Sequence, residues 1–127
     1  MIMYMIANQV IGEEVKTIKR VSMIQLIANP EKYDNELIRV IGFTLVTDRT
    51  SQIYLSHVDY EHNIPLNAIG LSLDKIKKNK YFKNQKKYSI IEGTFNAKRQ
   101  KSNLVNIGTI EKITRFDIWD YSYDSKQ

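Results

Sequence analysis

The chain contains no cysteine, and this absence excludes several kinds of chemistry at once. Disulfides, thiolate metal sites and cysteine nucleophiles are removed, and such a chain is typical of a reducing compartment, so we expect a cytoplasmic protein. Proline occurs only twice and glycine five times in 127 residues, which excludes collagen-like and low-complexity chains. With 43% hydrophobic and 26% charged residues, the sequence predicts one ordered domain over residues 1–127, large enough to bury its own core.

Long apolar runs are also lacking. No run approaches the roughly 18 residues that a membrane-spanning helix needs. The apolar start, residues 1–6, has no basic segment before it and is too short for the hydrophobic part of an export signal. We therefore expect no membrane partner, and we interpret residues 1–20 as an N-terminal arm or an edge strand.

Motifs of common enzymes are absent as well. The patterns of phosphate-binding loops, dinucleotide-binding turns and nucleophile elbows do not occur. The two histidines, His57 and His62, lie near Asp59 and Glu61, and imidazole with carboxylate can bind a metal or transfer protons. Their spacing matches no established ligand signature, however, and a polar loop after a strand explains them more simply. We predict a non-enzyme with no catalytic residues, no cofactor and no metal.

Positive charge is present in excess and is concentrated in one part of the chain. Residues 75–101 contain ten basic residues and one acidic residue, whereas the whole chain has a net charge of +5, so the remainder is negative. Such a block can attract nucleic acid, an acidic protein or a phosphorylated ligand, or it can simply keep the protein soluble.

Local patterns predict one helix followed by five strands. Ser22 and Gln25 form an S-x-x-Q capping box, Val21 can pack on Leu26, and Pro30 ends the helix after about two turns. Residues rich in β-branched and aromatic side chains then predict strands, the first with a bend or bulge at Gly42. The predicted strands are 37–46, 52–58, 67–74, 88–97 and 105–120. Residues 59–67 read as irregular, and a short helix can form in the lysine-rich connection 75–87.

Three strands, a long connection and a hairpin of two strands follow the element order of an OB-fold, a five-stranded Greek-key barrel. The segments NPEKYDNELIRVIGF, IIEGTF and GTIEKITRFDIW resemble those of small bacterial OB-type domains. The resemblance covers about residues 20–120 and implies a mainly β, OB-like barrel over 21–120 with a polar tail over 121–127. Some domains of this appearance are immunity proteins that neutralise a toxin, and others bind nucleic acid.

Two binding functions follow as expectations, and the oligomeric state stays open. The first is stoichiometric binding of a toxin-like partner protein, since aromatic side chains often anchor such interfaces and acidic groups can complement a partner. Its candidate residues are Asp59, Tyr60, Glu61, Trp119, Tyr121 and Tyr123. The alternative is binding of single-stranded nucleic acid by cations in the first hairpin turn and in the loop between the fourth and fifth strands. Its candidate residues are Arg49, Lys98, Arg99 and Lys101.

Overall fold

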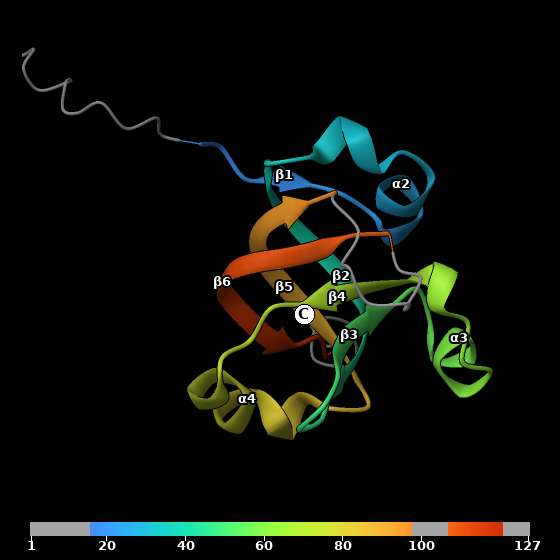
Figure 1. Cartoon of the computed structure of the whole chain (residues 1–127), viewed down its shortest axis with the longest axis vertical. Helices are drawn as coiled ribbons and strands as arrows, with labels where there is room; N and C mark the ends of the chain where they lie inside the picture. The colour runs from blue at the N-terminus through green and yellow to red at the C-terminus, as the bar shows by residue number, and fades with distance from the viewer. Residues whose placement is uncertain (1–15, 98–106, 121–127) are drawn as a thin grey trace, which may run out of the picture.

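The computed structural model describes residues 16–97 and 107–120, which form a closed five-stranded barrel (Figure 1). The barrel strands are β2 (Leu37–Val46), β3 (Ser51–Tyr54), β4 (Ala68–Leu71), β5 (Lys87–Asn96) and β6 (Thr109–Ile118), and β1 (Lys19–Arg20) pairs with β2 at the edge. The order is β1-β2-β3-β4-β6-β5, and β5 pairs back with β2 to close the barrel. Within the barrel only β4 and β6 pair in parallel. This mixed Greek-key order confirms the predicted OB-like fold class.

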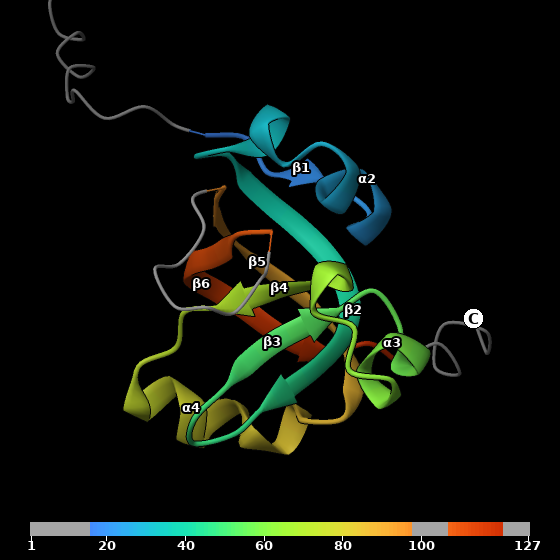
Figure 2. The same cartoon turned by 45° about the vertical axis from the view of Figure 1, so that its right-hand side comes forward.

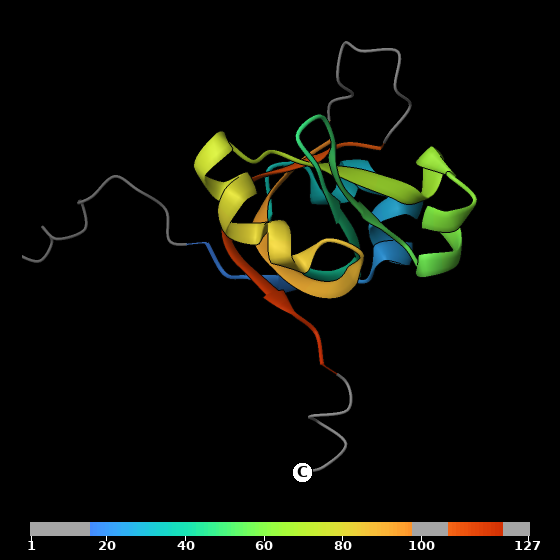
Figure 3. The same cartoon turned by 90° about the horizontal axis from the view of Figure 1, so that it is seen from below.

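Short helices close or flank the barrel. They are α2 (Met23–Ala28), η1 (Pro30–Tyr33), α3 (His57–Glu61), η2 (Pro65–Asn67), α4 (Lys75–Tyr81) and η3 (Phe82–Asn84), where η denotes a 3-10 helix. The capping box of α2 is confirmed: Gln25 N donates to Ser22 Oγ at 3.0 Å, and Ser22 N donates to Gln25 Oε1 at 2.9 Å. Figures 1 and 3 place α2 near one end of the barrel and α4 with η3 at the opposite end.

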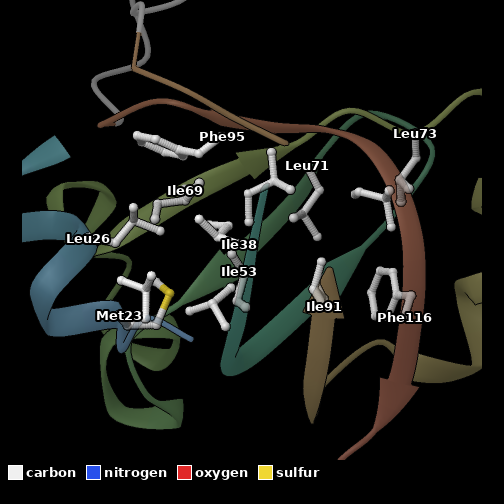
Figure 4. Packing of buried hydrophobic residues seen from close by; sticks show 14 of the residues in the cluster. Met23, Leu26, Ile38, Ile53, Ile69, Leu71, Leu73, Ile91, Phe95 and Phe116 are labelled. Atoms are coloured by element: carbon white, nitrogen blue, oxygen red, sulfur yellow. The ribbon is translucent and has the colours of Figure 1, made fainter. Parts of the chain in front are cut away.

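The core is the barrel interior (Figure 4). Alternate residues of each strand point inward, so Ile38 and Val40 of β2 are buried whereas Arg39 and Ile41 face outward. The labelled inward side chains come from α2 and from all five barrel strands: Met23, Leu26, Ile38, Ile53, Ile69, Leu71, Ile91, Phe95 and Phe116. The strands thus present their other faces to solvent or to the flanking helices.

The sequence predicts a bend or bulge at Gly42. The pairing of β2 with β5 runs through Gly42 and Ser89 without a register shift, so this pairing has no bulge there. A Cβ atom at position 42 would lie 2.6 Å from both Ile53 Cγ1 and Tyr54 O, so glycine lets β3 approach β2 closely. The register shift of the barrel instead lies between β5 and β6, opposite Gly93.

The strand predicted over 52–58 is wrong at its end. β3 stops at Tyr54, and His57 begins α3, because Ser56 caps a helix: its Oγ accepts from Asp59 N at 3.2 Å. Residues 59–67, predicted to be irregular, contain the rest of α3 and η2. The 67–74 strand is shorter than expected, and the helix in the 75–87 connection is present as α4. In the part of the chain that the structure describes, no helix has the length and apolarity to span a bilayer.

Candidate functional site

Helix α3 lies against the outer face of β2 and β3 (Figure 2). The Tyr60 ring sits 5.3 Å from Phe43 and 5.7 Å from Tyr54, and the His57 ring lies 4.7 Å from Phe43, all measured between ring centroids. Phe43 and Tyr54 are buried by this packing together with Ala68. Tyr60, predicted to bind a partner, is therefore largely engaged within the protein.

Asp59 fixes the position of α3. Its carboxylate accepts hydrogen bonds from Ser56 Oγ at 2.7 Å and Asn67 Nδ2 at 2.9 Å. These bonds, the one from Asn67 being the stronger influence, favour the ionised form and hold the pKa of Asp59 below its usual value. Both carboxylate oxygens are thus used internally, so this predicted binding residue has a structural role in tying α3 to the start of β4.

Tyr88 of β5 joins α3 to the end of β6. Its hydroxyl oxygen accepts from His57 N at 3.0 Å, and its backbone oxygen accepts from Trp119 N at 2.8 Å. The two predicted residues Glu61 and Trp119 therefore lie on either side of Tyr88, with Glu61 Oε2 3.5 Å from His57 Nε2. The other two predicted aromatics, Tyr121 and Tyr123, lie outside the described residues.

These contacts define what we call the Tyr88 surface, made of the exposed side chains of His57, Val58, Glu61, Tyr88 and Trp119. Val58 is 59% exposed, Tyr88 39% and Trp119 37%, so each of these large side chains faces solvent in part. Val58 and Tyr88 were not among the residues predicted from the sequence. A local signal, the S-x-x-D helix cap at 56–59, could have placed Val58 on a helix. No local signal could have placed Tyr88, because its position depends on its pairing with Phe43 across β2 and β5.

An apolar groove lies along β2 beside this surface. It has a volume of about 440 Å³ and lies between the start of α2 and the exposed part of β2. Ile24, Ile41 and Leu55 supply apolar lining, and Arg20 and Arg39 supply charge. Ile41 is two residues from Phe43, the cross-strand partner of Tyr88, so the groove extends the apolar region toward α2.

A charged row crosses the outer face of β2, β5 and β6 next to the groove. Glu92 Oε2 accepts from Arg39 Nε at 2.7 Å and from Arg115 Nη1 at 3.1 Å, and Arg115 Nε also donates to Asp117 Oδ2 at 2.8 Å. Burial alone would raise the pKa of Glu92, but the hydrogen bonds from Arg39 and Arg115 outweigh burial and lower that pKa. The row is well paired, so it serves to hold three strands in register.

The residues predicted for nucleic-acid binding are described only in part. Arg49 is exposed in the turn between β2 and β3, whereas Lys98, Arg99 and Lys101 lie outside the described residues. Single-strand binders of this fold stack bases on aromatic rings of the face formed here by β3 and β4. Tyr54 is the one aromatic residue of those two strands, and Tyr60 covers it.

Within residues 16–97 and 107–120, no group of three or more metal-ligating side chains is placed to hold an ion. His62 is directed to its own helix, with Nδ1 2.9 Å from Val58 O. Comparison with protein-family models, with curated proteins and with solved structures found no match for this chain. The closed mixed barrel is consistent with an OB-like fold, and the geometry of its surface has to carry any functional argument.

Proposed function

We propose that this chain is a non-enzymatic binding domain that neutralises a partner protein by stoichiometric binding, as immunity proteins and antitoxins do. The observation that carries the proposal is the exposure of Tyr88 and of Trp119, whose backbones are hydrogen bonded, and of Val58 on the helix that the Tyr88 hydroxyl contacts. Tyrosine and tryptophan are the residues that most often dominate binding energy when a partner covers them. The Tyr88 surface is thus the part of the described protein with the composition of a protein interface.

Preorganisation supports the same proposal. Helix α3 is anchored by the rings of Phe43 and Tyr54 and by both carboxylate oxygens of Asp59, so little freedom is left to lose on binding. A stable interface covers about 800 Å² on each partner. Tyr88 and Trp119 are 39% and 37% exposed, so they would supply only part of that area, and the groove beside them would have to supply more.

Charge indicates the kind of partner. The acidic side chain of Glu61 belongs to the Tyr88 surface and lies on α3, 3.5 Å from His57, whereas Asp117 near Trp119 is already paired with Arg115. A partner face with basic groups around an apolar centre would complement this arrangement, since charges at the rim of an interface steer association and select partners. The proposed partner is therefore a protein with a basic binding face.

The test is affinity capture from the native host with the tagged chain, in nuclease-treated and untreated halves. We expect one protein at close to equal stoichiometry in both halves. Val58→Asp and Trp119→Ala should each weaken its binding by about thirtyfold or more, the effect of losing a strong interface anchor. Ile76→Asp, which changes a still more exposed aliphatic residue on α4, should leave binding unchanged.

Two outcomes would count against the proposal. Retention of the partner by both Val58→Asp and Trp119→Ala would place the interface elsewhere. Recovery of nucleic acid that disappears with nuclease, with no protein left, would favour the alternative of single-strand binding, and Arg49→Ala would then weaken capture in a salt-dependent way.

A further inference from the structure

A second exposed surface lies on α4 and η3, at the end of the barrel away from α2 (Figures 1 and 3). Contacts fix which side of these helices faces the barrel. The Tyr81 ring stacks on Phe116 with centroids 4.7 Å apart, Asn84 Nδ2 donates to Phe116 O at 3.2 Å, and Lys77 Nζ donates to Ile113 O at 2.9 Å. Positions 77, 81 and 84 therefore point inward, as helical spacing requires.

The remaining positions form an outward surface that is both basic and apolar. We call this surface the α4 face, and it consists of two neighbouring stripes with helical spacing. One stripe is Ile76, Lys80 and Lys83, and the other is Lys75, Asn79 and Phe82. All six residues are exposed, Ile76 to 78% and Phe82 to 52%.

The charge of this region is of one sign. Residues 75–87 contain seven lysines and no acidic residue. No ion pair neutralises Lys75, Lys80 or Lys83 within residues 16–97 and 107–120. An exposed isoleucine and phenylalanine among lysines without ion pairs would be complemented by a partner that offers negative charge and an apolar phase together.

We propose that the α4 face binds the surface of a membrane that contains anionic phospholipids. In the headgroup region, Ile76 and Phe82 can enter the boundary with the acyl chains while the ammonium groups of the lysines stay at the level of the phosphates. A nucleic acid would offer phosphates to the lysines and a base to Phe82, but it would leave Ile76 in water. The lipid surface is the partner that uses every large side chain of this face.

A polar pocket beside the α4 face supports the same ligand chemistry. It has a volume of about 340 Å³, and Lys80 and Lys83 line it together with Arg115 of β6. Asp117, another lining residue, is hydrogen bonded to Arg115, so the two lysines remain as the positive groups on the α4 side. A headgroup phosphate fits this position next to the exposed apolar side chains.

The sequence predicts no membrane partner because no apolar run is long enough to cross a bilayer, whereas the α4 face would lie on a membrane surface without crossing it. The α4 face and the Tyr88 surface have no residue in common, so the membrane proposal is independent of the proposed protein partner.

The experiment is co-sedimentation of the full chain with vesicles of phosphatidylcholine alone and of phosphatidylcholine mixed with phosphatidylglycerol. We expect binding to the anionic vesicles and loss of binding at high salt. Lys80→Gln with Lys83→Gln should weaken it about thirtyfold, at about 1 kcal/mol per lysine near the surface. The matched control, Lys32→Gln with Lys112→Gln, removes two exposed lysines from other elements and should weaken it far less.

The apolar contribution has its own pair of variants. Ile76→Ser with Phe82→Ser should weaken vesicle binding by at least tenfold, whereas Ile64→Ser with Leu66→Ser, which changes two exposed apolar residues elsewhere, should not. Equal binding to neutral and anionic vesicles, or no binding to either, would overturn the proposal. Binding of a single-stranded oligonucleotide that depends on Lys80 and Lys83, without vesicle binding, would assign the face to nucleic acid instead.

Discussion

Replacing Glu92 by glutamine should destabilise the protein by about 2 kcal/mol. Glu92 Oε2 accepts from Arg39 and Arg115, and its side chain is only 11% exposed. The substitution keeps the shape of the side chain, and an amide oxygen can still accept from the arginines, but the negative charge that attracts both guanidinium groups is removed, at a loss of about 1 kcal/mol for each bond. The two arginines are 28% and 40% exposed, so water can solvate them again, which keeps the cost below that of breaking a fully buried pair.

Urea unfolding at neutral pH measures this loss, and the midpoint should fall by about 1 M. Asp117→Asn is the matched control, because Asp117 also binds Arg115, at 2.8 Å, but is 61% exposed. That exposed pair should contribute less than about 1 kcal/mol. Equal costs for the two substitutions, or a neutral Glu92→Gln, would refute the argument that burial makes the Glu92 bonds strong.

Comparing the wild type with Glu92→Gln at different pH values gives a second test. The pKa of Glu92 is lower in the folded state than the usual value of about 4.3 in an unfolded chain. The stability that its charge contributes is therefore fully present above that usual value and is lost as the pH falls through the lower folded pKa. The difference in stability between wild type and Glu92→Gln should stay constant near neutral pH and shrink below about pH 4; a difference that grows on acidification would contradict the assignment.

Two further substitutions test local packing. Gly42→Ala should lower the free energy of unfolding by about 1–3 kcal/mol, because its Cβ would meet the rigid backbone oxygen of Tyr54 at 2.6 Å; an unchanged thermal unfolding midpoint would mean that β3 can move away. Asp59→Ala should cost about 1–2 kcal/mol by removing the bonds from Ser56 and Asn67, seen in urea unfolding, while the folded variant keeps its affinity for a partner. If Asp59→Ala instead loses partner affinity while its free energy of unfolding is unchanged, Asp59 contacts the partner directly.

Elements governed by local signals could be predicted from the sequence. The capping box at Ser22 located α2, and the β-branched runs located all five barrel strands and their order. The error after Tyr54 arose because a short run with two apolar residues was read as a continuing strand, although Ser56 and Asp59 have the spacing of a helix cap. Residues 55–59 could continue the strand or begin a helix. The packing of Tyr60 on β2 and β3 favours the helix, and this long-range contact is not visible in the sequence.

The candidate site depended more on long-range pairing. Glu61 and Trp119 were selected for their residue types alone, and only the contacts of Tyr88 with His57 and Trp119 bring them to one region. Phe43, Tyr54 and Tyr88 looked like scattered strand aromatics in the sequence. The register of β2 with β3 and β5 makes them cross-strand neighbours, and α3 then covers the first two and leaves the third exposed.

The position of α3 has a consequence for how this barrel could change function. The Tyr60 ring covers Phe43 at a tilted angle and Tyr54 edge-on, so α3 shields both rings from solvent. A variant in which a tight turn replaces residues 56–66 would uncover two adjacent rings on a fold that commonly binds oligonucleotides there. Helix α3 carries the exposed Val58 and at the same time covers these two rings, so this one connection determines whether the rings are accessible to a ligand.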